Sequence, residues 1–172
     1  MSNLEELYRE VILDHYRSPR NRGELETPPA ILSEGKNPLC GDELKLYVQI
    51  KGDVISDVKM GGSGCSISQA SASMMTSAIK GKTISEARIL IDEFKALMDV
   101  HESKLDSTDT DSGKENSEVM RSEVLGELEA MTGVVKFPVR IKCATLSFNT
   151  LARALDMNDD KVSNDQDFAT TE

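Results

Sequence analysis

The sequence predicts a mixed α/β (α+β) fold in which an antiparallel β-hairpin is combined with amphipathic helices. The hairpin is indicated by apolar and polar residues that alternate over 44–50 and again over 54–60, on either side of the turn signal Gly52-Asp53. Helices are indicated before and after the hairpin by apolar residues at the i, i+3, i+4, i+7 spacing. A third observation is that each of the three cysteines falls at or near the end of an expected element, so we expect the fold to bring them together.

Composition limits the classes of function. The chain has 172 residues, which is enough for one domain with a core, and we expect a single domain over 1–156. Its 30 acidic residues outnumber 20 basic ones without a basic cluster, which argues against nucleic acid and anionic membranes as partners. No run of 18 apolar residues predicts a membrane span, and the first residues lack the apolar core of a signal peptide. We therefore expect a cytoplasmic protein with reduced thiols.

The first half of the chain contains the elements that surround the hairpin. A helix is expected over 3–16, ending before Ser18-Pro19. Residues 20–36 are interpreted as a loop, with a short strand near 31–32 as an alternative. After the hairpin we expect a helix over 65–79 and another over 83–98, the second opened by a capping box of Thr83 and Glu86.

The second half is less regular. Residues 100–117 are polar and without periodicity, and they predict a flexible acidic insertion. A helix is expected over 118–131, followed by extended or irregular chain over 134–141 and a final helix that begins near Cys143. Residues 157–172 predict an acidic, disordered tail.

Two of the cysteines flank the hairpin. Cys40 stands just before its first strand, whereas Cys65 follows Gly61-Gly62-Ser63-Gly64 at the end of the second strand and the start of a helix. Because the open ends of an antiparallel pair are adjacent, these two cysteines should lie close together. The free amides and the dipole at a helix N-terminus would favour an ionised sulfur at Cys65. Cys143 would join them from the inward face of the last helix.

Three thiols and the carboxylate of Asp42 make a four-ligand metal site conceivable. Zinc accepts sulfur and carboxylate oxygen in tetrahedral geometry, and ferrous iron and iron–sulfur clusters also select thiolates. Such a site carries net negative charge, and Arg140 and Lys142 are near enough in sequence to balance it. The alternatives are that the cysteines are small buried side chains and that Asp42 caps a turn.

Four motifs taken together resemble a known family. The segments Asp14–Gly23, Cys40–Asp42, Gly64–Ser68 and Lys136–Cys143 are similar to the IscU/NifU-like iron–sulfur cluster assembly family. IscU-type scaffolds carry a histidine immediately before the third cysteine, where this chain has Lys142. Together with the extra sequence between the second and third cysteines, this residue indicates the SufU-like branch.

The resemblance implies a fold and a function. The fold would be a small antiparallel sheet with helices packed on it, and the residues that would hold Zn2+ are Cys40, Asp42, Cys65 and Cys143. Cys40 would accept a persulfide sulfur from a SufS-type cysteine desulfurase that depends on pyridoxal phosphate. Cys40 would be freed when that partner contributes a ligand to the zinc. The sulfur would then pass to downstream iron–sulfur assembly or acceptor proteins.

Two alternatives remain open at this stage. The first is a scaffold that assembles a transient iron–sulfur cluster on the same residues, and the second is a non-catalytic interaction module stabilised by zinc. A zinc hydrolase is disfavoured because the sequence offers no placed Glu or His base beside the site.

Overall fold

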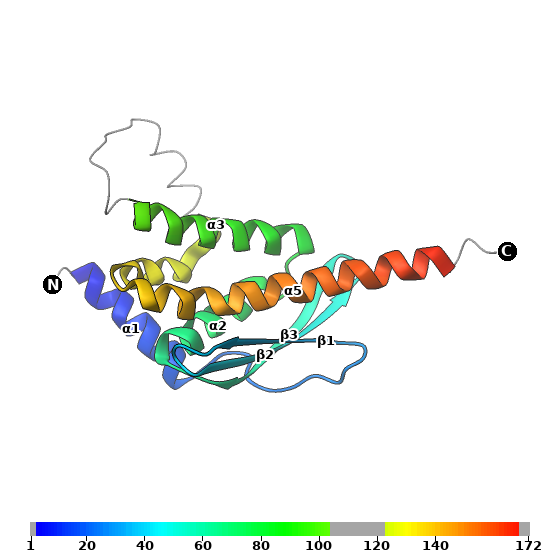
Figure 1. Ribbon diagram of the computed structural model, residues 1–172, viewed down its shortest axis with the longest axis horizontal. Helices are drawn as coiled ribbons and strands as arrows, with labels where there is room; N and C mark the ends of the chain where they lie inside the picture. The colour runs from blue at the N-terminus through cyan, green and yellow to red at the C-terminus, as the bar shows by residue number, and fades with distance from the viewer. Residues whose placement is uncertain (1–2, 104–122, 169–172) are drawn as a thin grey trace, which may run out of the picture.

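The computed structural model describes residues 3–103 and 123–168, which form an α+β fold built in layers (Figure 1). One layer is an antiparallel sheet in the order β1-β2-β3, with β1 at Ile31–Asn37, β2 at Asp42–Lys51 and β3 at Val54–Ser63. Helices α2 (Ser66–Ile79) and α5 (Pro138–Phe168) pack on this sheet. Helix α3 (Ile84–Ser103) and the 3-10 helix η1 (Gly126–Lys136) pack against α5, and α1 (Asn3–Arg17) packs against α2 and η1. The predicted small antiparallel sheet with helices is confirmed.

The predicted hairpin is strands β2 and β3. Leu46 pairs with Met60 and Val48 with Val58, so the apolar sets of the two strands share one buried face. Gly52 at the turn has a φ of +65°, a conformation that glycine adopts without strain. The alternation in the sequence therefore identified both strands, whereas their register, shifted by an irregularity at Gln49/Ile50, comes from the structure.

The loop predicted over 20–36 is wrong at its end, where the alternative of a short strand near 31–32 is confirmed and the strand is longer than expected. Residues Ile31–Asn37 form strand β1, which pairs with β2 from Ile31↔Val48 to Asn37↔Asp42. The sequence analysis had taken Gly35 as a sign of a loop. In the structure, a Cβ atom at this position would collide with the side chain of Thr150 on α5. Glycine is needed here because α5 packs closely over the strand, and not because the chain turns.

The helices of the first half are where the sequence placed them. The capping box that opens α3 is formed in both directions, since Thr83 N–H donates to Glu86 Oε2 (2.9 Å) and Glu86 N–H donates to Thr83 Oγ1 (3.2 Å). Helix α3 extends to Ser103, so residues 100–103 of the predicted insertion are helical. The rest of that insertion lies outside the described residues.

The segment before Cys143 differs from the prediction. Residues 123–125 are helical and lead into η1, so the described part of the expected helix 118–131 is mostly 3-10 helix. The extended chain predicted over 134–141 is wrong, because η1 continues to Lys136 and α5 begins at Pro138. Proline suits the first turn of a helix, where its missing N–H has no partner to lose. Cys143 consequently lies in the second turn of α5 and not at its start.

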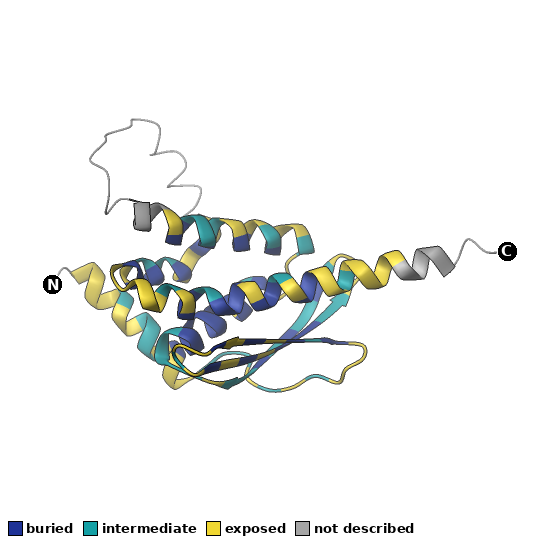
Figure 2. Ribbon diagram, viewed as in Figure 1, coloured by how far each residue is buried: buried dark blue, intermediate teal, exposed yellow. Residues whose placement is uncertain are grey.

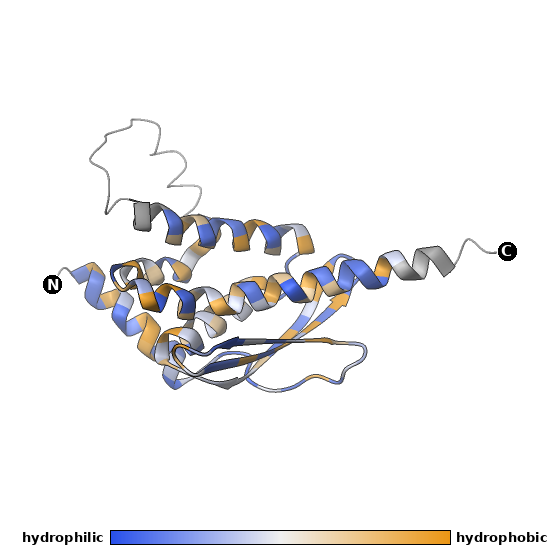
Figure 3. Cartoon of the chain, in the orientation of Figure 1, coloured by the Kyte–Doolittle hydropathy of each residue, from blue (hydrophilic) through white to orange (hydrophobic). Residues whose placement is uncertain are grey.

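Helix α5 is also longer at its other end than expected. It continues to Phe168, so residues 157–168 of the predicted disordered tail are helical in the structure. Figure 1 shows this end projecting beyond the body of the molecule. The side chains of 157–163, the part of this end whose burial is described, are mostly exposed (Figure 2), and the coloured part of the projection in Figure 3 is mostly hydrophilic. Arg88 on α3 forms ion pairs with Asp156 (3.1 Å) and Asp159 (2.7 Å), which hold the beginning of this segment.

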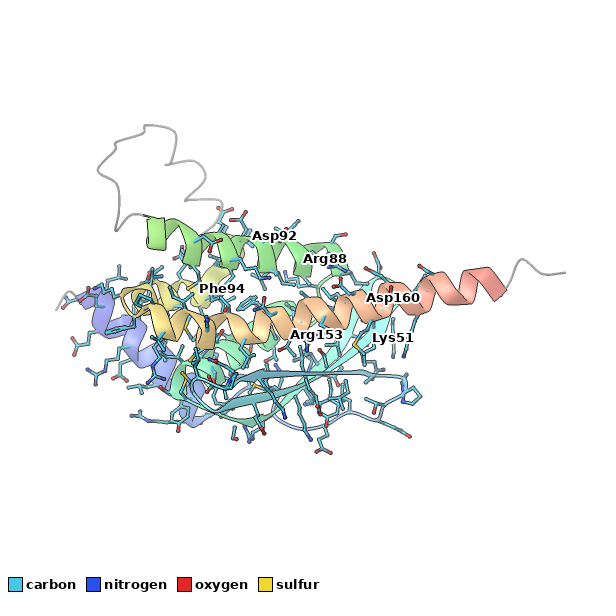
Figure 4. All side chains as sticks on the ribbon, viewed as in Figure 1. Lys51, Arg88, Asp92, Phe94, Arg153 and Asp160 are labelled. Atoms are coloured by element: carbon cyan, nitrogen blue, oxygen red, sulfur yellow. The ribbon has the colours of Figure 1, made fainter. Side chains whose placement is uncertain are left out.

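The main core lies between the sheet and the helices. Phe94 of α3 and Phe148 of α5 are both fully buried and stack with ring centroids 4.0 Å apart. Figure 4 shows Phe94 on the side of α3 that faces α5 and Arg88 on the same helix. Among the described residues, no helix is long and apolar enough to cross a membrane.

Candidate metal centre

The centre of the site is the short turn between β1 and β2. Residues 38–41 connect the two strands, and Asp42 is the first residue of β2. The turn is closed by a hydrogen bond in which Cys40 N–H donates to the carbonyl of Asn37 (3.3 Å), and Gly41 has a φ of +66°. The turn places the Cys40 sulfur next to Cys143 on α5.

Three of the predicted site residues come together. One ligand atom each from Cys40, Asp42 and Cys143 lies within 4.8 Å of the other two. The Cys143 thiol donates a hydrogen bond to the Cys40 sulfur at 3.1 Å, although about a hundred residues separate them in sequence. Cys143 (0% exposed) and Asp42 (1% exposed) are buried, whereas Cys40 is half-buried. The Cys40 side chain is therefore the accessible member of this group.

Cys65 stands beside this group and is linked to it through Asp42. It is the N-cap residue of α2, where its sulfur accepts a hydrogen bond from Ser68 N–H (3.5 Å). Its own N–H donates to Asp42 Oδ1 (2.8 Å), and its sulfur lies 3.9 Å from Asp42 Oδ2. The expected junction of strand and helix is confirmed, and Asp42 forms hydrogen bonds with both Cys65 and Cys143.

Burial and hydrogen bonding shift the acidities of two of these groups. Burial alone would raise the pKa of the Asp42 carboxyl, but hydrogen bonds, first of all from the Cys65 amide, hold it below its ordinary value of 3.8. Burial raises the pKa of the Cys143 thiol far above its ordinary value of 9.0, and hydrogen bonds to Cys40 and Asp42 raise it further. Without a metal, the site thus contains an ionised carboxylate and a protonated Cys143.

Arg140 supplies positive charge to this site. Its pKa is raised first by a hydrogen bond with Cys143 and then by the charges of Cys65 and Cys40. The side chain is exposed, so the guanidinium reaches the cysteines from the solvent side. Lys142 is also exposed, and its supporting role stays a prediction.

The sequence reasoning missed one residue of the site, Asn37. This residue is 6% exposed, and its side-chain amide lies 3.4 Å from Asp42 Oδ2 and 3.5 Å from Cys143 Sγ. The sequence does show a polar residue directly before Pro38, three positions from Cys40. Its burial could not be predicted because the segment before it had been interpreted mainly as a loop.

Comparison with known proteins decides the family. The model of the NifU-like N terminal domain matches residues 7–144. The chain belongs to this family. It is 46% identical over 154 residues to the zinc-dependent sulfurtransferase SufU of Bacillus subtilis (strain 168), covering 90% of this chain and 92% of that protein. It is 39% identical to the iron–sulfur cluster assembly scaffold protein IscU of Streptococcus pyogenes serotype M1, covering 90% of this chain and 86% of the relative.

A solved structure supports the same family assignment. It is a candidate iron–sulfur cluster assembly scaffold protein for the SUF system from Fervidobacterium islandicum AW-1, 35% identical to this chain with a TM-score of 0.71. The match covers 88% of this chain and 98% of the other. The NifU-like fold predicted from the four motifs is thereby confirmed.

The donor set of this NifU-like domain fits a metal that prefers sulfur. Tetrahedral zinc bonds of about 2.0–2.3 Å place neighbouring ligand atoms roughly 3.3–3.8 Å apart. The Cys65–Asp42 separation of 3.9 Å lies close to that range, whereas the two sulfurs of Cys143 and Cys40, 3.1 Å apart, would have to separate to roughly 3.8 Å to bind one zinc ion. The group of Cys40, Asp42 and Cys143 suits Zn2+ and also suits iron, and Cys65 stays a predicted fourth ligand.

Proposed function

We propose that this chain is an iron–sulfur cluster assembly protein that accepts sulfur from a cysteine desulfurase and depends on zinc to do so. The observation that carries the proposal is the convergence of Cys40, Asp42 and Cys143, with Cys40 at the accessible tip of a turn. The similarity to a zinc-dependent sulfurtransferase over nearly the whole chain supports it. The proposed zinc ligands are Cys40, Asp42, Cys65 and Cys143, with Arg140 and Lys142 in support.

Cys40 is the proposed acceptor because the other two sulfurs are more firmly held. Cys143 is fully buried on α5, and Cys65 caps α2, whereas Cys40 lies in a short turn that can move without shifting a helix or strand. Bound zinc would keep the cysteines in the thiolate form. The Cys40 thiolate would attack the terminal sulfur of the donor's persulfide. A new S–S bond forms on Cys40, the donor's S–S bond breaks, and the donor cysteine leaves as a thiolate with no net oxidation.

Exposed apolar side chains beside the cysteines support a protein as sulfur donor. Leu39 (67% exposed) is next to Cys40, and Val139 (61% exposed) lies one helical turn before Cys143 on α5. Phe137 is also 62% exposed. Large apolar side chains at such exposure are typical of contact surfaces. We propose a SufS-type desulfurase as the partner that covers them, and further iron–sulfur assembly or acceptor proteins as recipients of the sulfur.

The test is the turnover of a SufS-type desulfurase with cysteine, followed as alanine released. Adding the zinc-loaded protein should increase turnover, and Cys40→Ala should abolish the increase. Asp53→Ala, at the tip of the other hairpin, is the matched control and should stimulate like the wild type. If the wild type gives no stimulation, the sulfur-acceptor function is rejected. A zinc-stabilised interaction module would instead show stimulation that survives Cys40→Ala.

A cluster scaffold is the second candidate, favoured by the 39% identity to an IscU scaffold protein and by a donor set that also suits iron. Anaerobic incubation with iron and sulfide should then produce a visible chromophore that can be transferred to an apo-ferredoxin. Protein that keeps one tightly bound zinc and takes up no iron under these conditions would count against this function.

A further inference from the structure

Asn37 is positioned by strand β1, which ends beside the proposed metal ligands. It is the last residue of β1 and pairs in register with Asp42, the first residue of β2. The turn that carries Cys40 runs between these two residues. Any movement of the Asn37 side chain is restricted, because the residue is buried and its carbonyl accepts the Cys40 N–H.

The side chain of Asn37 reaches two of the proposed ligands at once. Its Nδ2 atom lies 3.4 Å from Asp42 Oδ2 and 3.5 Å from Cys143 Sγ. A side-chain amide nitrogen carries two protons, so both contacts can be hydrogen bonds at the same time. The Asp42 carboxylate only accepts, and so would Cys143 once a bound metal had made it a thiolate, which requires the NH2 end of the amide to face them.

The three cysteine sulfurs differ in their hydrogen-bond donors. Cys143 faces the Asn37 amide, and Cys65 accepts the Ser68 N–H at the start of α2. Within residues 3–103 and 123–168, the Cys40 sulfur has the Cys143 thiol as its partner and no N–H donor. Hydrogen bonds to a metal-bound sulfur withdraw electron density and hold its position. The sulfur that lacks such a bond is the more nucleophilic one.

We propose that Asn37 is a positioning residue of this centre, which anchors Asp42 and Cys143 and thereby directs sulfur acceptance to Cys40. The first part concerns the metal site alone, while the second rests on the proposed sulfur-acceptor function. The residue acts through the ligands and touches neither the donor nor the transferred sulfur.

The test compares Asn37→Leu, which keeps the branching at Cγ but is larger and has no donor, with Asn37→Asp, which keeps the shape but places carboxylate oxygens opposite the acceptors of Asp42 and Cys143. Lys36→Ala, an exposed neighbour on the same strand, is the matched control. Zinc affinity is measured by competition with a chromophoric chelator, and the Co2+-substituted proteins report the sulfur ligands by their charge-transfer bands. Melting of the chelator-treated proteins identifies a variant that has failed to fold.

We expect Asn37→Leu to weaken zinc binding by about 10–100-fold, the usual effect of losing an outer hydrogen bond to a ligand, and Asn37→Asp to weaken it at least as much. The charge-transfer bands should change in both variants, whereas Lys36→Ala should match the wild type. Unchanged affinity and spectra in folded variants would overturn the proposal.

A separate experiment tests whether Asn37 directs the sulfur to Cys40. After reaction with the desulfurase, mass spectrometry identifies which cysteine carries the persulfide. In the wild type the sulfur should be on Cys40, and in Asn37→Leu the ratio of Cys143 to Cys40 persulfide should rise by roughly tenfold. A loss of zinc affinity with all sulfur still on Cys40 would overturn the directing role, since a merely structural residue gives that result. If the wild type carries no sulfur on Cys40, the proposed function itself has failed, and the chelator assay still decides the anchoring role.

Discussion

Gly64 shows how closely the backbone surrounds the proposed ligands. A Cβ atom at this position would lie 2.5 Å from Asp42 Oδ1 and 2.7 Å from Ser68 Oγ. Both distances are too short, so Gly64→Ala should displace Asp42. We expect a loss of about 1–3 kcal/mol in the free energy of unfolding, as for other overpacked sites. Urea unfolding and chelator competition measure the stability and the accompanying fall in zinc affinity.

Gly133→Ala is the matched control for this prediction. No atom lies within 4 Å of a Cβ built there, and its φ is ordinary for any residue. The control should be close to wild type in stability and in zinc binding. Equal behaviour of the two variants would show that Gly64 is not selected for its approach to Asp42.

The buried Cys143 thiol predicts a dependence of stability on pH in the metal-free protein. Its pKa is raised in the folded state, so folding favours the protonated thiol. The stabilisation is complete below the ordinary pKa of 9.0 and is lost as the pH rises above it, because only the unfolded chain then releases the proton. We expect this group to contribute a decline of about 1.4 kcal/mol per pH unit above that value.

Cys143→Ala isolates this contribution, because the variant has no thiol to titrate at this position. Denaturant unfolding of metal-free protein between pH 8 and 10.5 should show a smaller decline for the variant than for the wild type. Identical slopes would mean that Cys143 ionises as readily in the folded protein as in the unfolded chain.

At the scale of elements, the last turn of α1 and the segment after it attach this helix to α2. His15 is buried, and its Nδ1 and Nε2 atoms lie 2.8 Å from Ser73 Oγ and 2.7 Å from Glu127 Oε2. Ser73 Oγ also accepts the backbone N–H of Arg20 (2.8 Å). The Asp14–Gly23 motif noted in the sequence therefore has a structural use in attaching α1.

Ser73→Ala tests this attachment. The variant leaves polar groups of His15 and Arg20 without a buried partner, and we expect a loss of about 1–3 kcal/mol in the free energy of unfolding. Glu127→Gln is the comparison, because the Glu127 side chain is 64% exposed and its pairing with His15 should contribute less than about 1 kcal/mol. Urea titration should rank Ser73→Ala well below Glu127→Gln, and the reverse order would contradict the attachment through Ser73.

At the scale of the molecule, the proposed metal site joins parts of the chain that are far apart in sequence. Its residues come from the β1–β2 turn, the N-terminus of α2 and the second turn of α5. A metal held there stabilises only the folded arrangement. With free zinc at about a thousandfold over Kd, the gain is about 4 kcal/mol, or roughly 10 °C in Tm.

Calorimetry of zinc-loaded and chelator-treated protein checks this prediction. The treated protein should still unfold in one transition, because the apolar core around Phe94 and Phe148 does not depend on the metal. Cys40→Ala should retain only part of the zinc-dependent shift. A Tm that is unchanged by chelation would show that the residues do not hold a metal in the folded state.

The sequence by itself determined the β2–β3 hairpin, helices α1 to α3 and the set of chemical groups at the centre. Alternation, helical spacing and a capping box depend on neighbouring residues only, and the four motifs were enough to indicate the family. Only the tertiary structure decided that the strand near 31–32 is formed and extends to Asn37, and that the Asn37 side chain contacts Asp42 and Cys143. Gly35 and Asn37 are explained by α5, which contacts them from more than a hundred residues away, and no local pattern records such a contact.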